Sequence, residues 1–269
     1  MIPPHERRIL EAHVRGCRLS ALAVIQTTQP LNEYEERQLK DLIKLRVRGL
    51  PLQYLTNSQG FYGREFYVNT AVLVPRPETE GLVELALKTL PPPEDTRRLF
   101  ALEFGTGSGC IGITLAIERK DMTTFASEAS VEALAVATEN SKTFRAVNVD
   151  FMHVSETPHL WQYDTIPRLD MLISNPPYLV MSDDIAKDVA EHEPPGALFT
   201  PDGDPMFFYR FLAELLEEKL APTGFGIFEI AEQRGLETSH VFETKGFVTE
   251  VHKDLTNRDR YLLVKRKGS

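Results

Sequence analysis

The stretch from Leu99 to Ala116 restricts the fold of this chain more than any other. It reads as a short apolar strand, a turn with glycine at positions 105, 107 and 109, and then an apolar helix. A strand, a glycine-rich turn and a helix in this order open a βαβ unit that binds a nucleotide at its turn. Because glycine has no Cβ, a ligand can approach the backbone of such a turn closely. The stretch therefore predicts an α/β fold built on a parallel sheet.

The spacing of the glycines bears on the kind of nucleotide. A dinucleotide site expects Gly-x-Gly-x-x-Gly around a pyrophosphate, whereas this turn reads Gly105-x-Gly107-x-Gly109. Glu103 comes two residues before the turn, where a carboxylate would repel a diphosphate and would suit the ammonium group of an amino acid. The turn therefore predicts a cofactor that carries an amino-acid moiety.

A second stretch, residues 169–179, joins an apolar run to Asn175-Pro176-Pro177-Tyr178. The prolines cannot donate to a strand ladder, so the strand is expected to stop at Asn175. The stiff turn then holds the Asn175 amide, the Pro176 carbonyl and the Tyr178 ring at the carboxyl end of a strand, where open α/β sheets bind ligands. The alternative is a loop that only ends strand pairing, and the glycine turn upstream favours the pocket.

Acidic residues stand at the ends of two further predicted strands. Residues 123–127 lead to Glu128, which can accept hydrogen bonds from both ribose hydroxyls of an adenosine cofactor. The alternative for Glu128 is an exposed loop carboxylate. Residues 149–154 lead to Glu156, which would then lie near an adenine amino group.

The length of 269 residues suits one sizeable α/β domain and a smaller partner. We expect a helical domain over 1–58, in which Asn32 pairs with Glu35 as a helix cap. Residues 59–80 predict a linker with a β-hairpin, and the α/β domain covers 81–269.

Two residues of the linker carry predictions of their own. Thr79 is expected to cap the helix that follows. Arg76 stands between two prolines, so it is either an ordinary linker cation or a fixed contact with ligand or substrate.

The chain ends in two predicted strands, 247–253 and 260–265, that follow a fifth strand at 224–230. Together with the four strands that end near Phe104, Glu128, Val154 and Asn175, they make seven. Because a short turn joins the last two, the hairpin predicts an antiparallel edge strand on an otherwise parallel sheet.

Charge and composition exclude several classes of protein. Residues 1–50 carry nine basic and six acidic residues, so this part is +3 and the remainder −12 within a net charge of −9. A field of that sign opposes stable nucleic-acid binding. No apolar run approaches the ~20 residues of a membrane span, and charges stand where a signal peptide would be apolar. Cys17 and Cys110 predict neither a disulfide framework nor a metal site, so we expect the reducing cytoplasm.

With these motifs together, the sequence resembles the HemK/PrmC family of AdoMet-dependent glutamine methyltransferases that modify peptide chain release factors. Asn-Pro-Pro-Tyr alone also occurs in amino-methyltransferases of DNA and RNA, while Pro-Arg-Pro-Glu-Thr-Glu and the N-terminal helical unit are more specific to the glutamine enzymes. The stretches that carry the resemblance are 49–55, 73–80, the glycine turn, Asn175–Tyr178, 253–255 and 259–260.

The resemblance implies a Rossmann-like AdoMet-dependent methyltransferase sheet of seven strands, the last one antiparallel, with a small N-terminal helical domain for substrate recognition. The implied reaction methylates the glutamine side chain in the Gly-Gly-Gln motif of release factors, by a cytoplasmic monomer. For catalysis and substrate binding it implies Asn175, Pro176, Pro177 and Tyr178, with Arg76 as a further substrate contact. For S-adenosyl-L-methionine it implies Glu103, Gly105, Thr106, Gly107, Ser108, Gly109, Glu128, Glu156, Thr157 and Asn175.

By the same resemblance, Asn175 and the Pro176 carbonyl each accept a hydrogen bond from the substrate NH2 group, and Tyr178 packs against the flat amide. The chain departs from the family in having Glu103, Glu128 and Glu156 where aspartate is usual, and Thr157 where an aromatic residue is common. Three alternatives remain open: a methyltransferase acting on a flipped nucleic-acid base, one acting on a ribosomal-protein glutamine, and a non-enzymatic AdoMet-binding scaffold.

Overall fold

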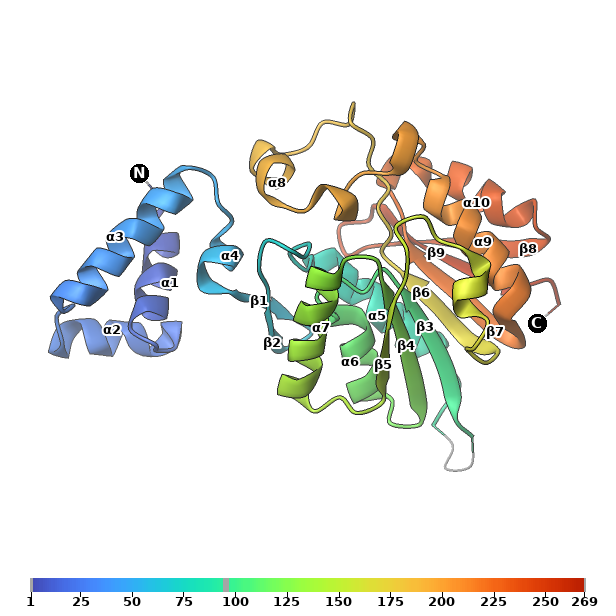
Figure 1. The fold of residues 1–269 in the computed structure, drawn as a ribbon, viewed down its shortest axis with the longest axis horizontal. Coiled ribbons are helices and arrows are strands. Elements are labelled where there is room, and N and C mark those ends of the chain that lie inside the picture. Colours follow the sequence, from blue (N-terminus) through green and yellow to red (C-terminus); the bar gives the residue numbers. More distant parts are fainter. Residues whose placement is uncertain (1, 94–96, 269) are drawn as a thin grey trace.

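The computed structural model describes residues 2–93 and 97–268. Met1 and Ser269, which begin the first and end the last predicted domain, and residues 94–96 lie outside the described residues. A mixed sheet with helices on both faces forms the main body, and a group of helices at the N-terminal end stands to one side of it (Figure 1). Within the described residues, no helix combines the length and apolar character that crossing a membrane requires.

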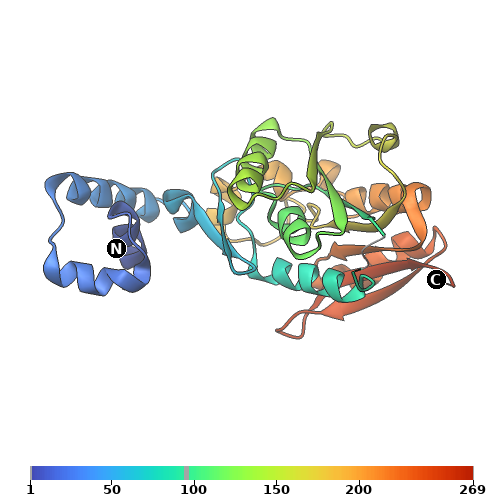
Figure 2. The same cartoon turned by 90° about the horizontal axis from the view of Figure 1, so that it is seen from below.

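The N-terminal group packs around a small apolar cluster that includes Leu10, Leu39 and Leu55. The predicted capping pair is confirmed: Asn32 Oδ1 accepts from the Glu35 N–H at 2.9 Å, and Glu35 Oε2 accepts from the Asn32 N–H at 2.9 Å. Figure 2 shows the group standing beside the sheet, with α4 and the hairpin that follows leading into it. Its helices are α1 (Pro4–Val14), α2 (Leu19–Thr28), α3 (Glu33–Val47) and α4 (Leu52–Thr56).

The connector contains the expected hairpin, with β1 (Ser58–Phe61) antiparallel to β2 (Arg64–Tyr67), and then helix α5 (Pro77–Thr89). The prediction that Thr79 caps this helix is wrong, because Arg76 is the cap residue and Thr79 lies buried inside the first turn. Pro77 explains the earlier start, since its fixed φ suits the first helical position and it has no N–H to leave unpaired.

Seven strands of the described chain form one sheet in the order β5-β4-β3-β6-β7-β9-β8. The strands from β3 to β7 run parallel, and β9 is antiparallel to both of its neighbours. The strands are β3 (Leu99–Phe104), β4 (Met122–Glu128), β5 (Val149–His153), β6 (Leu169–Ser174), β7 (Leu220–Glu229), β8 (Phe247–Lys253) and β9 (Asp259–Arg266).

The expected seven strands and the antiparallel last strand are confirmed, but the predicted edge position of that strand is wrong. β9 lies between β7 and β8, so β8 is the edge. The burial of the two strands gives the reason. β9 has four consecutive buried residues, Tyr261 to Val264, which need cover on both faces, whereas β8 is buried at Phe247 alone and is otherwise exposed or half-buried.

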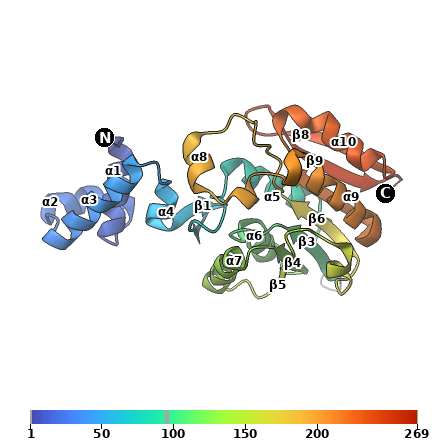
Figure 3. The ribbon, with the colours of Figure 1, turned by 45° about the horizontal axis from the view of Figure 1, so that its top comes forward.

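Helices cover both faces of the sheet (Figures 1 and 3). Helices α5 and α6 (Cys110–Glu118) pack on one face, with α7 (Val131–Phe144) beside α6. Helices α9 (Phe207–Lys219) and α10 (Gly235–Glu243) pack on the other face. The short helix α8 (Lys187–His192) lies between the N-terminal helices and the sheet in Figure 3. Short 3-10 helices are η1 (Leu160–Tyr163), η2 (Pro195–Ala197), η3 (Pro201–Gly203) and η4 (Glu232–Arg234).

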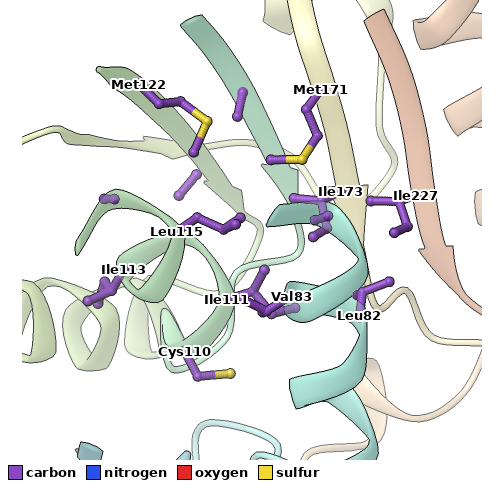
Figure 4. Close-up of a cluster of buried hydrophobic side chains, with 14 of the residues drawn as sticks. Leu82, Val83, Cys110, Ile111, Ile113, Leu115, Met122, Met171, Ile173 and Ile227 are labelled. Carbon is purple, nitrogen blue, oxygen red and sulfur yellow. The ribbon is translucent and has the colours of Figure 1, made fainter. Parts of the chain in front are cut away.

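One apolar core under α5 and α6 contains residues from the start of α6, directly after the glycine turn, and from the end of β6. Figure 4 shows side chains of these two helices gathered against side chains of β4, β6 and β7. All of the labelled residues are buried, including Leu82, Val83, Ile111, Leu115, Met122, Met171, Ile173 and Ile227.

The strand order places a topological switch point between β3 and β6. From β3 the chain continues to β4 on one side, while β6 lies on the other side and leads away to β7. Glu103 pairs with Ile173, so Gly105 and Asn175 each follow this pair by two residues at the same edge of the sheet. Open α/β sheets bind ligands in the crevice at this point.

Candidate active site

A cavity of about 480 Å³ opens at the carboxyl ends of β3, β4 and β6. This size lies within the usual range for small-molecule sites. The turn after β3, the ends of β4 and β5, and the corner after β6 all contribute to its wall. Among the predicted site residues, those that line it are Arg76, Gly105, Thr106, Gly107, Ser108, Glu128, Glu156, Asn175 and Pro177.

The glycines of the turn serve two different purposes. Gly105 and Gly107 have φ values of 73° and 53°, and a Cβ on either would meet no protein atom within 4 Å. Because both residues line the cavity, a side chain there would project into the space a ligand needs. Gly109 is absent from the cavity wall, and a Cβ there would come within 2.6 Å of Ile113 Cδ1. The same Cβ would come within 3.3 Å of Ala137 Cβ on α7, so Gly109 allows α7 to pack closely against the start of α6.

Glu103 lies beneath the glycine turn. Its Oε2 accepts from the Thr106 hydroxyl at 2.5 Å and from the Gly112 N–H at 3.0 Å, and its side chain is fully buried. Burial raises the pKa of this carboxyl to about 8, against the opposing effect of those two hydrogen bonds. Glu103 does not line the cavity, so the structure places it as a support of the turn. Its contact with an ammonium group stays a prediction.

Glu128 joins the turn after β3 to the turn after β4. Its Oε2 accepts from the Gly107 N–H at 2.8 Å, and its Oε1 accepts from the N–H groups of Ala129 at 2.9 Å and Ser130 at 3.0 Å. A carboxylate offers roughly four acceptor positions. Since backbone donors take three of them, Glu128 keeps acceptor capacity toward the cavity that it lines.

The two residues predicted after β5 differ in position. Glu156 is exposed and lines the cavity. Thr157 does not line it, and its carbonyl accepts a hydrogen bond from the Ser155 hydroxyl at 2.6 Å. Of the two residues, the structure therefore places only Glu156 in the cavity wall, and contact of either with the cofactor stays a prediction.

The corner after β6 is held by two residues that sequence reasoning did not assign to the site: Thr79, which lines the cavity, and Glu229, which does not. Asn175 Nδ2 donates to the Thr79 hydroxyl at 3.3 Å, and that hydroxyl donates to Glu229 Oε2 at 2.7 Å. The Tyr178 hydroxyl donates to Glu229 Oε1 at 3.5 Å. One signal for Glu229 was available, because it is the last residue of its strand, as Glu128 is of β4.

The members of the corner differ in their exposure to the cavity. Asn175 and Pro177 line the cavity, whereas Pro176 is buried and Tyr178 packs partly against the core under α9. Burial raises the pKa of Tyr178 well above its usual value, so its hydroxyl keeps its proton. Among the described residues, none donates a hydrogen bond to the Pro176 carbonyl or to Asn175 Oδ1.

Arg76 lies between two cavities. It lines the main cavity and also a second one of about 330 Å³ that the N-terminal helices share with α8. Its guanidinium contacts Glu193, and the second oxygen of Glu193 accepts from the Val74 N–H at 3.1 Å.

The segment after α8 forms a further wall of the cavity. Leu179 and Phe199 form an isolated parallel bridge, which holds residues 194–201 beside the Asn-Pro-Pro-Tyr corner. Phe208 and residues 71–73 complete this side. Their place at the cavity depends on contacts between segments far apart in the chain, which is why sequence reasoning did not assign them to the site.

The lining residues fit S-adenosyl-L-methionine. Glu128 and Glu156 offer carboxylate acceptors for hydroxyl and amino groups, and Gly105 and Gly107 leave space beside the backbone. Apolar side chains suited to a purine ring are also present, among them Ile111, Ala129, Val154 and Phe208.

Comparisons with known proteins agree with this geometry. Residues 83–192 match the family described as Methyltransferase small domain. A solved methyltransferase structure from Pyrococcus furiosus shares the fold, with a TM-score of 0.54 at 18% identity, covering 85% of this chain and 96% of that one.

Relatives of known name are closer in sequence. The chain is 38% identical over 217 residues to the release factor glutamine methyltransferase of Flavobacterium psychrophilum, which covers 80% of this chain and 75% of the relative. It is 36% identical over 241 residues to the protein of the same name from Bacteroides thetaiotaomicron, covering 88% and 83%. The resemblance seen in the sequence is confirmed, and the chain belongs to the release factor glutamine methyltransferase family.

Proposed function

We propose that this protein transfers a methyl group from S-adenosyl-L-methionine to the side-chain amide nitrogen (N5) of a glutamine in a peptide chain release factor. One observation carries the proposal: the glycine turn and the Asn175 corner leave adjacent parallel strands and line the same cavity. A cofactor on the turn and an amide in the corner would therefore be neighbours. The names of the relatives at 38% and 36% identity support the choice of substrate.

The corner suits an uncharged NH2 group. Bound S-adenosyl-L-methionine supplies an electrophilic methyl group, whereas the nitrogen of an amide is a weak nucleophile because its lone pair is delocalised into the carbonyl. Asn175 Oδ1 and the Pro176 carbonyl are two acceptors separated by a single peptide unit. Each would take one hydrogen bond from the substrate NH2 group and so fix the nitrogen. Orientation of this kind can lower the free-energy barrier to methyl transfer by on the order of 7–11 kcal/mol.

The wall beside the corner would shield the reacting groups from water once both substrates are bound. The Thr200 N–H donates to the Leu179 carbonyl at 2.9 Å, and the Leu179 N–H donates to the Leu198 carbonyl at 3.1 Å. These bonds hold the 194–201 segment next to Tyr178. Exclusion of water strengthens the hydrogen bonds that orient the substrate amide.

The acidic lining of the cavity supports a neutral protein side chain over a nucleic-acid base as substrate. Glu128 and Glu156 line the cavity, with Arg76 as the cation of the wall, and Arg76 is already paired with Glu193. A nucleic-acid substrate requires unpaired basic groups along its phosphates.

The test is incubation with isotopically labelled S-adenosyl-L-methionine and purified release factor, with ribosomes and DNA as competing acceptors, followed by peptide mass mapping. We expect label on one glutamine of the release factor. Asn175→Ala should abolish transfer while S-adenosyl-L-methionine affinity stays within about tenfold by calorimetry. Label on DNA or on a ribosomal protein in preference to the release factor would refute the proposed substrate.

A further inference from the structure

We propose that Thr79 and Glu229 are positioning residues that hold the Asn175 side chain with its oxygen, and not its NH2 group, toward the substrate nitrogen. The proposal rests on the proposed function, because it deepens the role of the same corner. It assigns a role to Thr79, which lines the cavity, and to Glu229, which lies behind the cavity wall.

The three residues form a hydrogen-bonded row that links the end of β6 to α5 and to the end of β7, with Thr79 and Glu229 buried and Asn175 half-buried. Asn175 follows β6, Thr79 comes from the first turn of α5, and Glu229 ends β7. The Asn175 Nδ2 to Thr79 Oγ1 distance is 3.3 Å, and the Thr79 Oγ1 to Glu229 Oε2 distance is 2.7 Å. Thr79 and Glu229 are only 3% and 2% exposed, so water cannot substitute for either partner.

The protons of this row allow one arrangement. An ionised carboxylate only accepts hydrogen bonds, and a hydroxyl has a single proton to donate. Thr79 therefore donates to Glu229, and its oxygen can then only accept from Asn175. The end of the Asn175 amide that faces Thr79 must be NH2, which directs Oδ1 away from Thr79. Because Asn175 lines the cavity, this oxygen is available there.

The orientation matters because the two ends of an asparagine amide have nearly the same shape. Packing alone cannot distinguish them, so a hydrogen bond must do so. With Asn175 reversed, its NH2 group would face the NH2 group of the substrate, and the corner would lose one of its two acceptors. The carboxylate of Glu229 thus sets the polarity of the site through Thr79 without touching substrate.

Glu229 is itself held from several elements. The Tyr209 hydroxyl of α9 donates to the Glu229 backbone carbonyl at 2.7 Å, and the Tyr178 hydroxyl approaches Oε1 at 3.5 Å. Burial raises the pKa of Glu229 to about 7, and the charge of Glu78 on α5 adds to this effect. The hydrogen bonds from Thr79 and Tyr178 and the charge of Arg260 on β9 act in the opposite direction and lower the pKa. Burial raises the pKa of Tyr261 on β9, and the negative charge of Glu229 raises it further.

A protonated Glu229 can donate to Thr79, and the direction of the whole row is then no longer fixed. We therefore expect the rate of methyl transfer to fall as the pH drops through the pKa of Glu229. This dependence is a readout that a purely structural role for Glu229 would not produce.

The first experiment compares Thr79→Val with Thr79→Ser in single-turnover methyl transfer at saturating S-adenosyl-L-methionine and release factor. Valine has the shape of threonine without the hydroxyl, so we expect its rate to fall by about tenfold or more, with cofactor affinity within about threefold. Serine should restore the rate to within about threefold of wild type. A wild-type rate for the valine variant, or an equal loss in both variants, would overturn the proposal.

The second experiment records the rate between pH 6 and pH 8 for wild type and Glu229→Gln. Glutamine is neutral throughout and can both donate to and accept from Thr79, so its rate should be lower than that of wild type at pH 8 and should not change with pH across this range. Glu214→Gln, an exposed acid on α9, is the matched control and should keep the wild-type acid limb. An unchanged acid limb in Glu229→Gln contradicts the proposal.

A third measurement separates this proposal from the proposed function. In ¹⁵N spectra of the full chain without release factor, the Asn175 side-chain NH2 signal, assigned by its loss in Asn175→Ala, should be protected from solvent exchange in wild type and Thr79→Ser. Protection should be lost in Thr79→Val. An unprotected NH2 group in wild type would overturn the proposed roles of Thr79 and Glu229, whether or not release factor is methylated. A protected NH2 group in a protein that does not methylate release factor would overturn the proposed function and leave these two roles standing.

Discussion

Arg76 and Glu193, 117 residues apart in sequence, form an ion pair in which Arg76 Nη2 lies 2.6 Å from Glu193 Oε1. The Glu193 side chain is 2% exposed and that of Arg76 is 33% exposed. Glu193 also accepts from the Val74 N–H, so one carboxylate fastens the segment after α8 to the connector. Both cavities share this wall through Arg76.

Glu193→Ala should weaken both the fold and the use of the protein substrate. The change leaves the Arg76 guanidinium and the Val74 N–H without their acceptor, which should lower the free energy of unfolding by about 1–3 kcal/mol. Because the 194–201 wall is then less firmly held, KM for release factor should rise. Urea unfolding and steady-state methylation kinetics measure the two effects.

Glu191→Ala, two residues earlier and on α8, provides a matched control. Its partner is Lys187, and the two side chains are 51% and 85% exposed, so the pair should contribute about 0–1 kcal/mol. Equal losses of stability in the Glu191 and Glu193 variants would contradict the importance assigned to the buried pair.

Glu128→Ala should weaken cofactor binding. The carboxylate lines the cavity and fixes the Gly107 N–H, so its removal takes away acceptors for the adenosine and loosens the turn. We expect the Kd for S-adenosyl-L-methionine to rise about tenfold or more, or about 1.4 kcal/mol, in calorimetry. Glu139→Ala, an exposed acid on α7 with the same change of charge, should leave the Kd unaltered. An unchanged Kd for Glu128→Ala would remove Glu128 from the cofactor site.

The meeting of the glycine turn and the Asn-Pro-Pro-Tyr corner could be predicted from sequence. Both follow short apolar runs, and parallel strands present their carboxyl ends at one edge of the sheet. The structure places them on adjacent strands, with Glu103 paired to Ile173. Local pattern was sufficient here because each motif follows directly from its own strand.

Roles that depend on distant partners could not be predicted in this way. Thr79 reads as a helix cap from its neighbours, yet its hydroxyl donates to Glu229, 150 residues further along the chain. Glu103 reads as a cavity acid, yet its carboxyl lies under the turn because Gly112 leaves room for it. The position of β9 inside the sheet also depended on which strand carried the longer buried run.

The buried Glu103 should make stability depend on pH. Its pKa is raised to about 8 from the usual 4.5, so between these values the folded state keeps a proton that the unfolded state has lost. Stability should therefore fall as the pH rises from about 4.5 to about 8, with a slope of at most about 1.4 kcal/mol per pH unit from this group. Urea unfolding at pH 5.5 and pH 8 measures the difference.

Glu103→Gln isolates this contribution. The amide replaces the neutral acid in shape and still accepts from Thr106 and Gly112, so this variant should be more stable than wild type at pH 8 and close to it at pH 5.5. Glu139→Gln, an exposed acid, should keep the wild-type slope. The same slope in Glu103→Gln as in wild type would show that another group causes the dependence.

Gly112→Ala should test how α6 accommodates the longer acid at position 103. A Cβ at Gly112 would stand 2.4 Å from Glu103 Oε2, and that oxygen cannot move away without breaking its bonds to Thr106 and Gly112. We expect a loss of about 1–3 kcal/mol in urea unfolding, even though alanine is the better helix former. Glu103→Asp shortens the acid by one methylene and leaves room for the new methyl group, so the double variant should be more stable than Gly112→Ala alone. A double-mutant cycle should give a coupling of about 1–2 kcal/mol, and strict additivity would show that the two positions do not compete for this space.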